Sequence, residues 1–166
     1  MDKENKTDWT TFKVEVPIKA DPQRIKDAWS TQETLEKWFL KSAEFTTPKA
    51  KRRERNEKIH PGDIFLWRWH GWPDATLENG EIIYPEKDEF LRFIFGKTGT
   101  VGVSVLTKND QTILSLVQEN IPEDERSRMD YHVGCKTGWT FYLLNLKSFL
   151  LGGPDLRNKD ASLSMD

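Results

Sequence analysis

The spacing of hydrophobic residues changes once along this chain, and that change limits the folds open to it. From about residue 40 to residue 120, apolar and polar residues alternate between turn residues, which is typical of antiparallel strands. From His132 to Leu150 the apolar residues instead recur every three or four positions, which predicts one long amphipathic helix. A Gly-Gly-Pro sequence that begins at Gly152 ends this helix.

The N-terminal part of the chain adds one strand and two short helices. Alternation from Phe12 to Ile18 predicts the strand, and Asp21 followed by Pro22 is a helix start. The sequence Ser30–Glu33 resembles a capping box and predicts a second helix directly afterwards. The resulting fold class is α+β, with a curved antiparallel sheet and two short helices wrapped on a long C-terminal helix. Such a sheet tends to leave an apolar cavity against its helix.

Smaller features of the pattern give predictions at single positions. Residues 63–70 are read as a strand with Trp67 and Trp69 facing inward and Arg68 facing solvent. By the same alternation Arg92 is expected to be exposed. The pairs Asn79-Gly80 and Asn109-Asp110 are expected to form turns or bulges.

The length of 166 residues fits one domain. We expect a disordered N-terminus over residues 1–8, a single domain over residues 9–157 and a flexible tail over residues 158–166. The net charge of −2 gives no overall attraction to nucleic acid or to a membrane surface, and neither partner is predicted. A single cysteine, Cys135, excludes an internal disulfide, and the N-terminus has no apolar core of a signal peptide, so a cytoplasmic location is expected.

Aromatic residues are the main candidates for a binding site. The Trp-rich sequence from Trp67 to Trp72 either lines a pocket for a planar or lipid-like molecule or fills the core, and both interpretations stay open. The predicted pocket wall combines one residue after the short helices, residues from the strands, and residues of the long helix: Trp38, Phe65, Trp67, Trp69, Phe93, Phe95, Trp139, Leu143 and Leu146.

Catalytic and metal-binding patterns are weak in this sequence. His132 and Cys135 lie three residues apart on the long helix, but a buried thiol beside an unrelated imidazole is favoured over a catalytic pair. His60 and His70 add no paired spacing of the kind that zinc sites use. No catalytic residue, metal or cofactor is therefore predicted. The basic sequence Lys49–Lys58 is interpreted as a solvated loop, with binding of an acidic partner as the alternative.

Three blocks of the sequence carry a resemblance to a known family. They are Ile18–Phe39 with its Lys37-Trp38-Phe39 end, Pro61–Phe65, and Gly138–Lys147 followed by Leu150 and Gly152. Together they resemble the START-like helix-grip superfamily (SRPBCC, Bet v 1-like) and, within it, the activator of heat-shock-protein-90 ATPase homologue type of domain. The sequence departs from that pattern at Asp63, where a second glycine is common, and in the long stretch Thr46–His60.

The resemblance implies a ligand-binding or protein-binding scaffold. Our first hypothesis is a non-enzymatic domain that binds an apolar or aromatic small molecule between the sheet and the long helix. The second is a protein-interaction module with a chaperone-type partner, and the third is a cyclase-like or hydrolase-like enzyme using His70 or His132. The sequence does not predict an oligomeric state.

Overall fold

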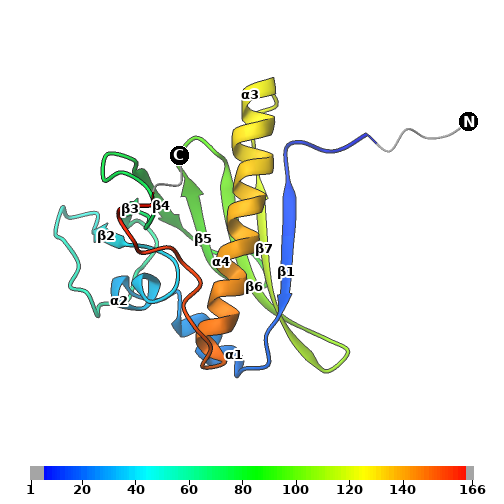
Figure 1. Cartoon of the computed structure of the whole chain (residues 1–166), viewed down its shortest axis with the longest axis horizontal. Coiled ribbons are helices and arrows are strands. Elements are labelled where there is room, and N and C mark those ends of the chain that lie inside the picture. The colour runs from blue at the N-terminus through cyan, green and yellow to red at the C-terminus, as the bar shows by residue number, and fades with distance from the viewer. Residues whose placement is uncertain (1–5, 164–166) are drawn as a thin grey trace, which may run out of the picture.

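The computed structural model describes residues 6–163 and contains one antiparallel sheet of seven strands in the order β1-β7-β6-β5-β4-β3-β2. The strands are β1 Phe12–Pro17, β2 Ser42–Thr46, β3 Ile64–Arg68, β4 Glu78–Ile83, β5 Glu89–Phe95, β6 Thr100–Lys108 and β7 Gln111–Glu119. The helical segments are α1 Pro22–Asp27, α2 Gln32–Glu36, α3 Glu125–Ser127, η1 Arg128–Val133 and α4 Gly134–Leu150. Helix α4 lies across one face of the curved sheet, which confirms the predicted fold class (Figure 1).

Both short helices begin at capping residues, and α1 contacts the C-terminal end of α4. Asp21 caps α1 by accepting a hydrogen bond from the backbone N–H of Gln23 at 2.7 Å, as predicted. Arg24 on α1 then donates to the backbone oxygen of Leu150 at 3.1 Å. Helix α2 is capped by Thr31, one residue after the predicted start.

The long helix begins earlier than its apolar pattern indicates. The helical segments α3, η1 and α4 follow one another without interruption, and the middle one, Arg128–Val133, has π-helical geometry. Asp124 caps the start by accepting from the backbone N–H of Ser127. Beyond α4, the buried Arg157 donates to the backbone oxygens of Lys37 and Leu40 and so fastens the chain across the end of α2.

The disorder expected for residues 1–8 and the flexibility expected for residues 158–166 fall partly outside the described residues. Residues 1–5 and 164–166 are not described. Within the rest, Asn158 donates to the backbone oxygen of Leu163 at 2.9 Å, and Lys159 pairs with Asp155 at 2.8 Å.

The inward face of β3 agrees with the prediction. Phe65 and Trp67 are buried, while Arg68 is only half-buried. Trp69 lies just beyond the end of the strand and is also half-buried. The turn predicted at Asn109-Asp110 is confirmed, because both residues have positive φ angles (49° and 61°) between the paired ends of β6 and β7.

The turn predicted at Asn79-Gly80 is wrong, because both residues lie inside β4. A Cβ atom at Gly80 would lie 1.9 Å from the backbone oxygen of Ile94 and 2.5 Å from Cζ of Phe65. The glycine therefore allows the backbone of β5 and the ring of Phe65 to lie close to β4, and it does not mark a change of chain direction.

The exposure predicted for Arg92 is also wrong, because only 7% of the residue is exposed. Arg92 does point away from the apolar face, but carboxylates cover it there: it pairs with Glu89 at 2.8 Å, with Glu86 at 3.6 Å and with Glu119. Its partner on β6 is Gly102, which has no side chain to hold the guanidinium away from the sheet.

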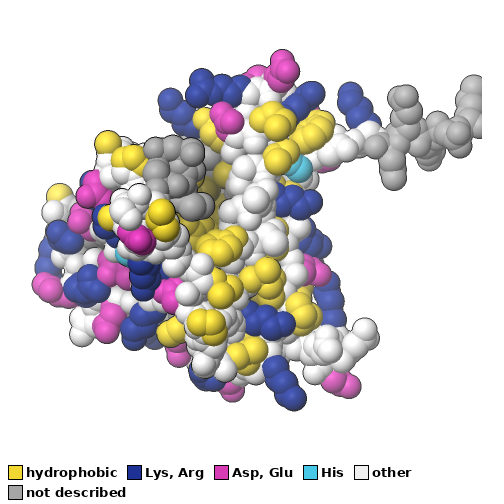
Figure 2. All heavy atoms as spheres, viewed as in Figure 1, with side chains coloured by type: hydrophobic (Ala, Val, Ile, Leu, Met, Phe, Trp, Pro, Cys, Tyr) yellow, Lys and Arg dark blue, Asp and Glu magenta, His cyan; other side chains and the backbone are white. Residues whose placement is uncertain are grey.

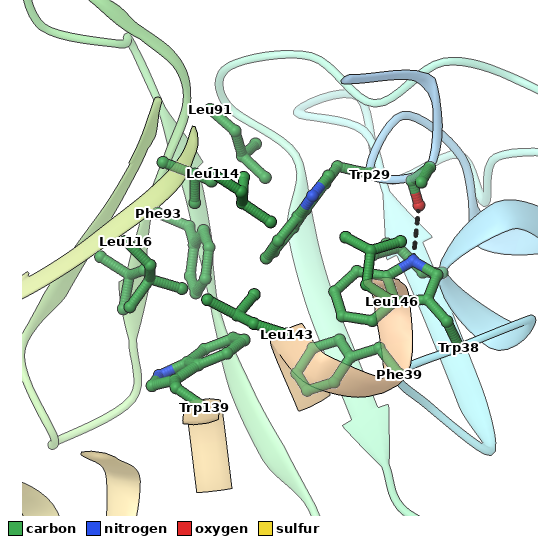
Figure 3. Packing of buried hydrophobic residues seen from close by; sticks show 14 of the residues in the cluster. Trp29, Trp38, Phe39, Leu91, Phe93, Leu114, Leu116, Trp139, Leu143 and Leu146 are labelled. Carbon is green, nitrogen blue, oxygen red and sulfur yellow. Dashed lines mark hydrogen bonds between the residues drawn. The ribbon is translucent and has the colours of Figure 1, made fainter. Parts of the chain in front are cut away.

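Large rings fill the space between the sheet and α4. We call this set the aromatic layer; its members are 0–3% exposed and are Trp29, Trp38, Phe39, Trp67, Phe93 and Trp139. Ring centroids lie 4.7 Å apart for Trp29 and Trp38 and 5.0 Å apart for Phe39 and Trp139. Leu143 and Leu146 of α4 pack against these rings (Figure 3). The centre of the concave side is therefore filled by side chains, and members of the layer line openings at its margins.

Candidate functional site

One opening lies between the end of the sheet and the first half of α4. We name it the Trp72 cleft; its volume is about 180 Å³. Its lining is mostly aromatic and comes from the segments after α2 and β3, from β5, and from η1 and α4: Phe39, Trp69, Trp72, Phe95, Asp130, Gly134, Cys135, Gly138, Trp139 and Tyr142. Such a site suits a small apolar or planar molecule.

The floor of the Trp72 cleft is continuous with the aromatic layer. The ring of Phe39 lies 5.0 Å from both Trp139 and Tyr142, measured between centroids. Phe95 lies 5.7 Å from Trp139, and Trp69 lies 6.3 Å from Phe95. Because each ring contacts its neighbours edge-on or at a tilt, the floor is a packed aromatic surface with little freedom to move.

The rim carries one large ring that faces solvent. Trp72 is 43% exposed and follows Gly71, whose φ of 84° turns the chain after β3. Two contacts of Asp74 hold the loop that bears Trp72. The Asp74 carboxylate pairs with Lys41 at 2.6 Å, and the Asp74 backbone oxygen accepts a hydrogen bond from Arg68 at 3.0 Å. These contacts tie down the loop from which the ring of Trp72 lines the cleft.

A buried polar chain orients Trp139 in the floor. Its indole N–H donates to Oε1 of Gln118 at 3.0 Å, and the amide of Gln118 donates to the backbone and hydroxyl oxygens of Thr98. Gln118 is fully buried on β7. Each of these hydrogen bonds satisfies a buried polar group. The series therefore fixes the plane of the indole and leaves none of its own donors without an acceptor.

Two titratable groups that line the Trp72 cleft, Cys135 and Tyr142, are held in their neutral forms. Burial raises the pKa of the Cys135 thiol, and burial raises the pKa of Tyr142 to about 12. Both groups therefore keep their protons at neutral pH and can donate hydrogen bonds. Asp130 lies at the rim, where Arg126 donates to its carboxylate at 3.1 Å.

The structure divides the nine predicted wall residues into two groups. Trp69, Phe95 and Trp139 come together in the Trp72 cleft. The other six lie in the closely packed interior and do not line the cleft: Trp38, Phe65, Trp67, Phe93, Leu143 and Leu146.

Sequence reasoning missed several lining residues. Cys135 and Tyr142 lie four positions before and three positions after Trp139, so helical spacing places them on the same side of α4 and could have identified them. Trp72 was part of the noted Trp-rich sequence, but its loop follows β3 and no strand alternation extends to it. Phe39 ends one of the blocks that carry the family resemblance, and its position on the cleft floor has no local signal.

The histidines do not join a catalytic or metal-binding group. Nε2 of His132 lies 2.9 Å from the backbone oxygen of Thr11, and the ring packs edge-on against Trp9 and Phe12. Burial lowers the pKa of His70, and the positive charge of Arg157 lowers it further. Among residues 6–163, no three His, Cys, Asp or Glu side chains come together in a way that could hold a metal ion.

The basic sequence Lys49–Lys58 was interpreted as a solvated loop, but three of its arginines form ion pairs with other parts of the fold. Arg53 donates to both carboxylate oxygens of Asp63, at 2.5 and 3.0 Å, and the Asp63 side chain is fully buried. This contact explains why an aspartate occupies the position where related sequences were expected to have glycine. Arg55 pairs with Glu36 at 2.5 Å and Arg52 pairs with Glu44 at 3.3 Å, both from more exposed positions.

The comparisons with known proteins agree on the fold. At 18% identity, the Aha1 dimer from Colwellia psychrerythraea superposes with a TM-score of 0.62 over 84% of this chain and 95% of its own. SSP2350 from Staphylococcus saprophyticus gives 15% identity and a TM-score of 0.64 over 89% and 96%. DynU16, from the dynemicin biosynthetic locus, gives 18% and 0.63 over 90% of this chain but 50% of its own. Among curated proteins, none matches this sequence.

Within the described part of the chain, no helix is both long and apolar enough to cross a membrane.

The sequence also agrees with a family pattern over most of its length. The family described as "Activator of Hsp90 ATPase homolog 1-like protein" matches residues 19–150, which include both short helices, six of the seven strands and α4. The chain therefore belongs to the Activator of Hsp90 ATPase homolog 1-like family.

Proposed function

We propose that this protein binds a small apolar or aromatic molecule in the Trp72 cleft and carries out no reaction on it. The observation that carries the proposal is the exposed ring of Trp72, which lines the cleft beside a packed aromatic floor. A concave site lined by rings and furnished with a few donors is a common form of small-molecule site. Tyr142 and Cys135 line this cleft, and their protonated O–H and S–H groups are the candidate donors.

The protonation states of the cleft support binding without catalysis. A thiol with a raised pKa is a poor nucleophile at neutral pH, because the thiolate is the reactive form. His132, the nearest imidazole along the helix, faces the backbone of Thr11. Cys135 and Tyr142 thus offer hydrogen-bond donors to a ligand rather than an activated nucleophile.

The uncharged dye Nile red tests this proposal, because one end of its fused rings can enter the cleft beside Trp72 while the rest of the dye stays at the opening. We expect its fluorescence to rise saturably with the wild-type protein, and Trp72→Ala to weaken the affinity about tenfold, since a buried contact with a tryptophan ring is often a dominant one. Trp72 is exposed, so the variant should unfold at nearly the same urea concentration as the wild type.

Tyr84→Ala is the matched control, because Tyr84 is an 81% exposed aromatic residue that does not line the cleft. Its affinity for the dye should equal that of the wild type. Equal loss in both variants, or no saturable binding by the wild type, would contradict the proposal.

A second candidate function is self-association through the outer side of α4. Phe141, Leu144 and Phe149 are 39–45% exposed there, and hydrophobic side chains show along this side of the molecule (Figure 2). The Colwellia relative is described as a dimer. If Nile red does not bind the Trp72 cleft, a second copy of this chain against α4 becomes the favoured partner.

A further inference from the structure

A second pocket lies on the other side of the aromatic layer from the Trp72 cleft. We name it the Trp29 pocket; its volume is about 240 Å³. It is enclosed by α1 and the residues after it, by residues 58–61, by the end of β4 and by the start of β5, through Gln23, Lys26, Asp27, Trp29, Ser30, Lys58, Ile59, Pro61, Ile82, Ile83, Pro85, Phe90 and Leu91. No residue lines both openings.

Backbone hydrogen bonds hold the walls of the Trp29 pocket together. The N–H of Ile59 donates to the backbone oxygen of Ser30 at 2.9 Å, which ties the two sides of the opening. The N–H of Ile82 donates to the backbone oxygen of Asp63 at 2.8 Å, and Gly62 donates back to Ile82 at 2.7 Å. The pocket is therefore a preformed feature of the fold, and a ligand would not have to order its walls.

The floor of the pocket is apolar and includes a tryptophan with an unused donor. Ile82, Leu91 and Trp29 are each less than 10% exposed. The ring of Trp29 lies among Leu91, Leu114, Trp38 and Leu146 (Figure 3). Its buried indole N–H has no hydrogen-bond partner, whereas the indole of Trp38 donates to the backbone oxygen of Ala28 at 2.9 Å. Without a fixed acceptor, the Trp29 N–H resonance should respond to a molecule that enters the pocket.

The rim of the pocket carries an excess of positive charge. Lys26 and Lys58 line it, and neither belongs to an ion pair among residues 6–163. The carboxylate that also lines the pocket, Asp27, already accepts a hydrogen bond from Gln23 at 2.8 Å. Lys26 is half-buried and Lys58 is exposed, and the long stem of a lysine can cover apolar surface while its ammonium group stays in water.

We propose that the Trp29 pocket is a second binding site, which takes a small molecule with an apolar body and a single carboxylate. The apolar body contacts Ile82, Leu91 and the ring of Trp29, and the carboxylate lies at the opening between Lys26 and Lys58. The volume is below that of most sites for drug-sized ligands, which limits the occupant to a short chain or one ring. This site and the Trp72 cleft have separate linings, so the proposal stands independently of the function proposed above.

Sodium octanoate, compared with octan-1-ol, tests the proposal on the ¹⁵N-labelled full chain. The Trp29 indole resonance, assigned with Trp29→Phe, should shift saturably, and octanoate should bind about fivefold more tightly than octan-1-ol because of its charge. In Lys26→Met/Lys58→Met this preference should vanish. Lys136→Met, which removes an exposed lysine of α4 outside the pocket, should retain it.

Three results would overturn the proposal: equal affinities of the wild type for the two probes, an unchanged preference in the double lysine variant, or shifts confined to the indoles of Trp72 and Trp139. The last result would place octanoate in the Trp72 cleft. A pocket-filling variant, Ile83→Trp, should lose octanoate binding while it keeps Nile red binding. If the lysine variant fails to fold, the comparison of the two probes on the wild type still decides the question.

Discussion

Arg53 lies in the most basic part of the chain, and its guanidinium faces a carboxylate that has no exposed surface. The bonds from Arg53 and from the N–H of His60 are what allow Asp63 to lie buried at the entry to β3. The pairing raises the pKa of Arg53, chiefly through the hydrogen bond with Asp63. Sequence reasoning saw the excess of charge but had no means to identify this partner, ten positions away across a loop.

We predict that Arg53→Met destabilises the protein by about 3 kcal/mol, because it leaves the buried Asp63 carboxylate without its partner. Arg52→Met should change the free energy of unfolding by less than about 0.5 kcal/mol, since the Arg52–Glu44 pair is exposed. Urea unfolding of both variants measures the difference. Similar losses in the two variants would show that the Arg53–Asp63 contact has no special weight.

At the scale of elements, the spacing of apolar residues was enough to predict the order of strands and helices. Each element buries one face, and the repeat of its apolar residues differs between a strand and a helix. The limits of the elements were harder to predict. Asn79-Gly80 has the composition of a turn but lies within β4, where the ring of Phe65 and the backbone of β5 leave no room for a side chain. Such a requirement comes from neighbouring strands and leaves no periodic signal.

Two glycines allow a matched test at this scale. Gly80→Ala should destabilise the protein by at least about 2 kcal/mol, because the new Cβ would overlap the backbone oxygen of Ile94. Gly138→Ala on α4 should stabilise it by about 0.5–1 kcal/mol, because nothing lies within 4 Å of the added atom and alanine favours the helix. Thermal or urea unfolding measures both; a stable Gly80→Ala variant would contradict the packing described for β4.

At the scale of the whole molecule, the aromatic layer determines where a ligand has room. The sequence indicated a cavity between the sheet and α4, and it named aromatic residues for its wall. It did not predict how far those rings fill the space, because contacts such as those of Phe39 with Trp139 join segments about a hundred residues apart. With the centre filled by these rings, the Trp72 cleft and the Trp29 pocket are two openings that lie beside the layer.

A crystal structure under xenon pressure tests this arrangement most directly, because xenon enters apolar space without requiring knowledge of the natural ligand. We predict xenon in the Trp72 cleft, between the rings of Trp72 and Tyr142, and none between the fully buried side chains of Phe93 and Leu143. Xenon between Phe93 and Leu143 with an empty Trp72 cleft would contradict the account, since the ligand space would then be an interior cavity beneath α4.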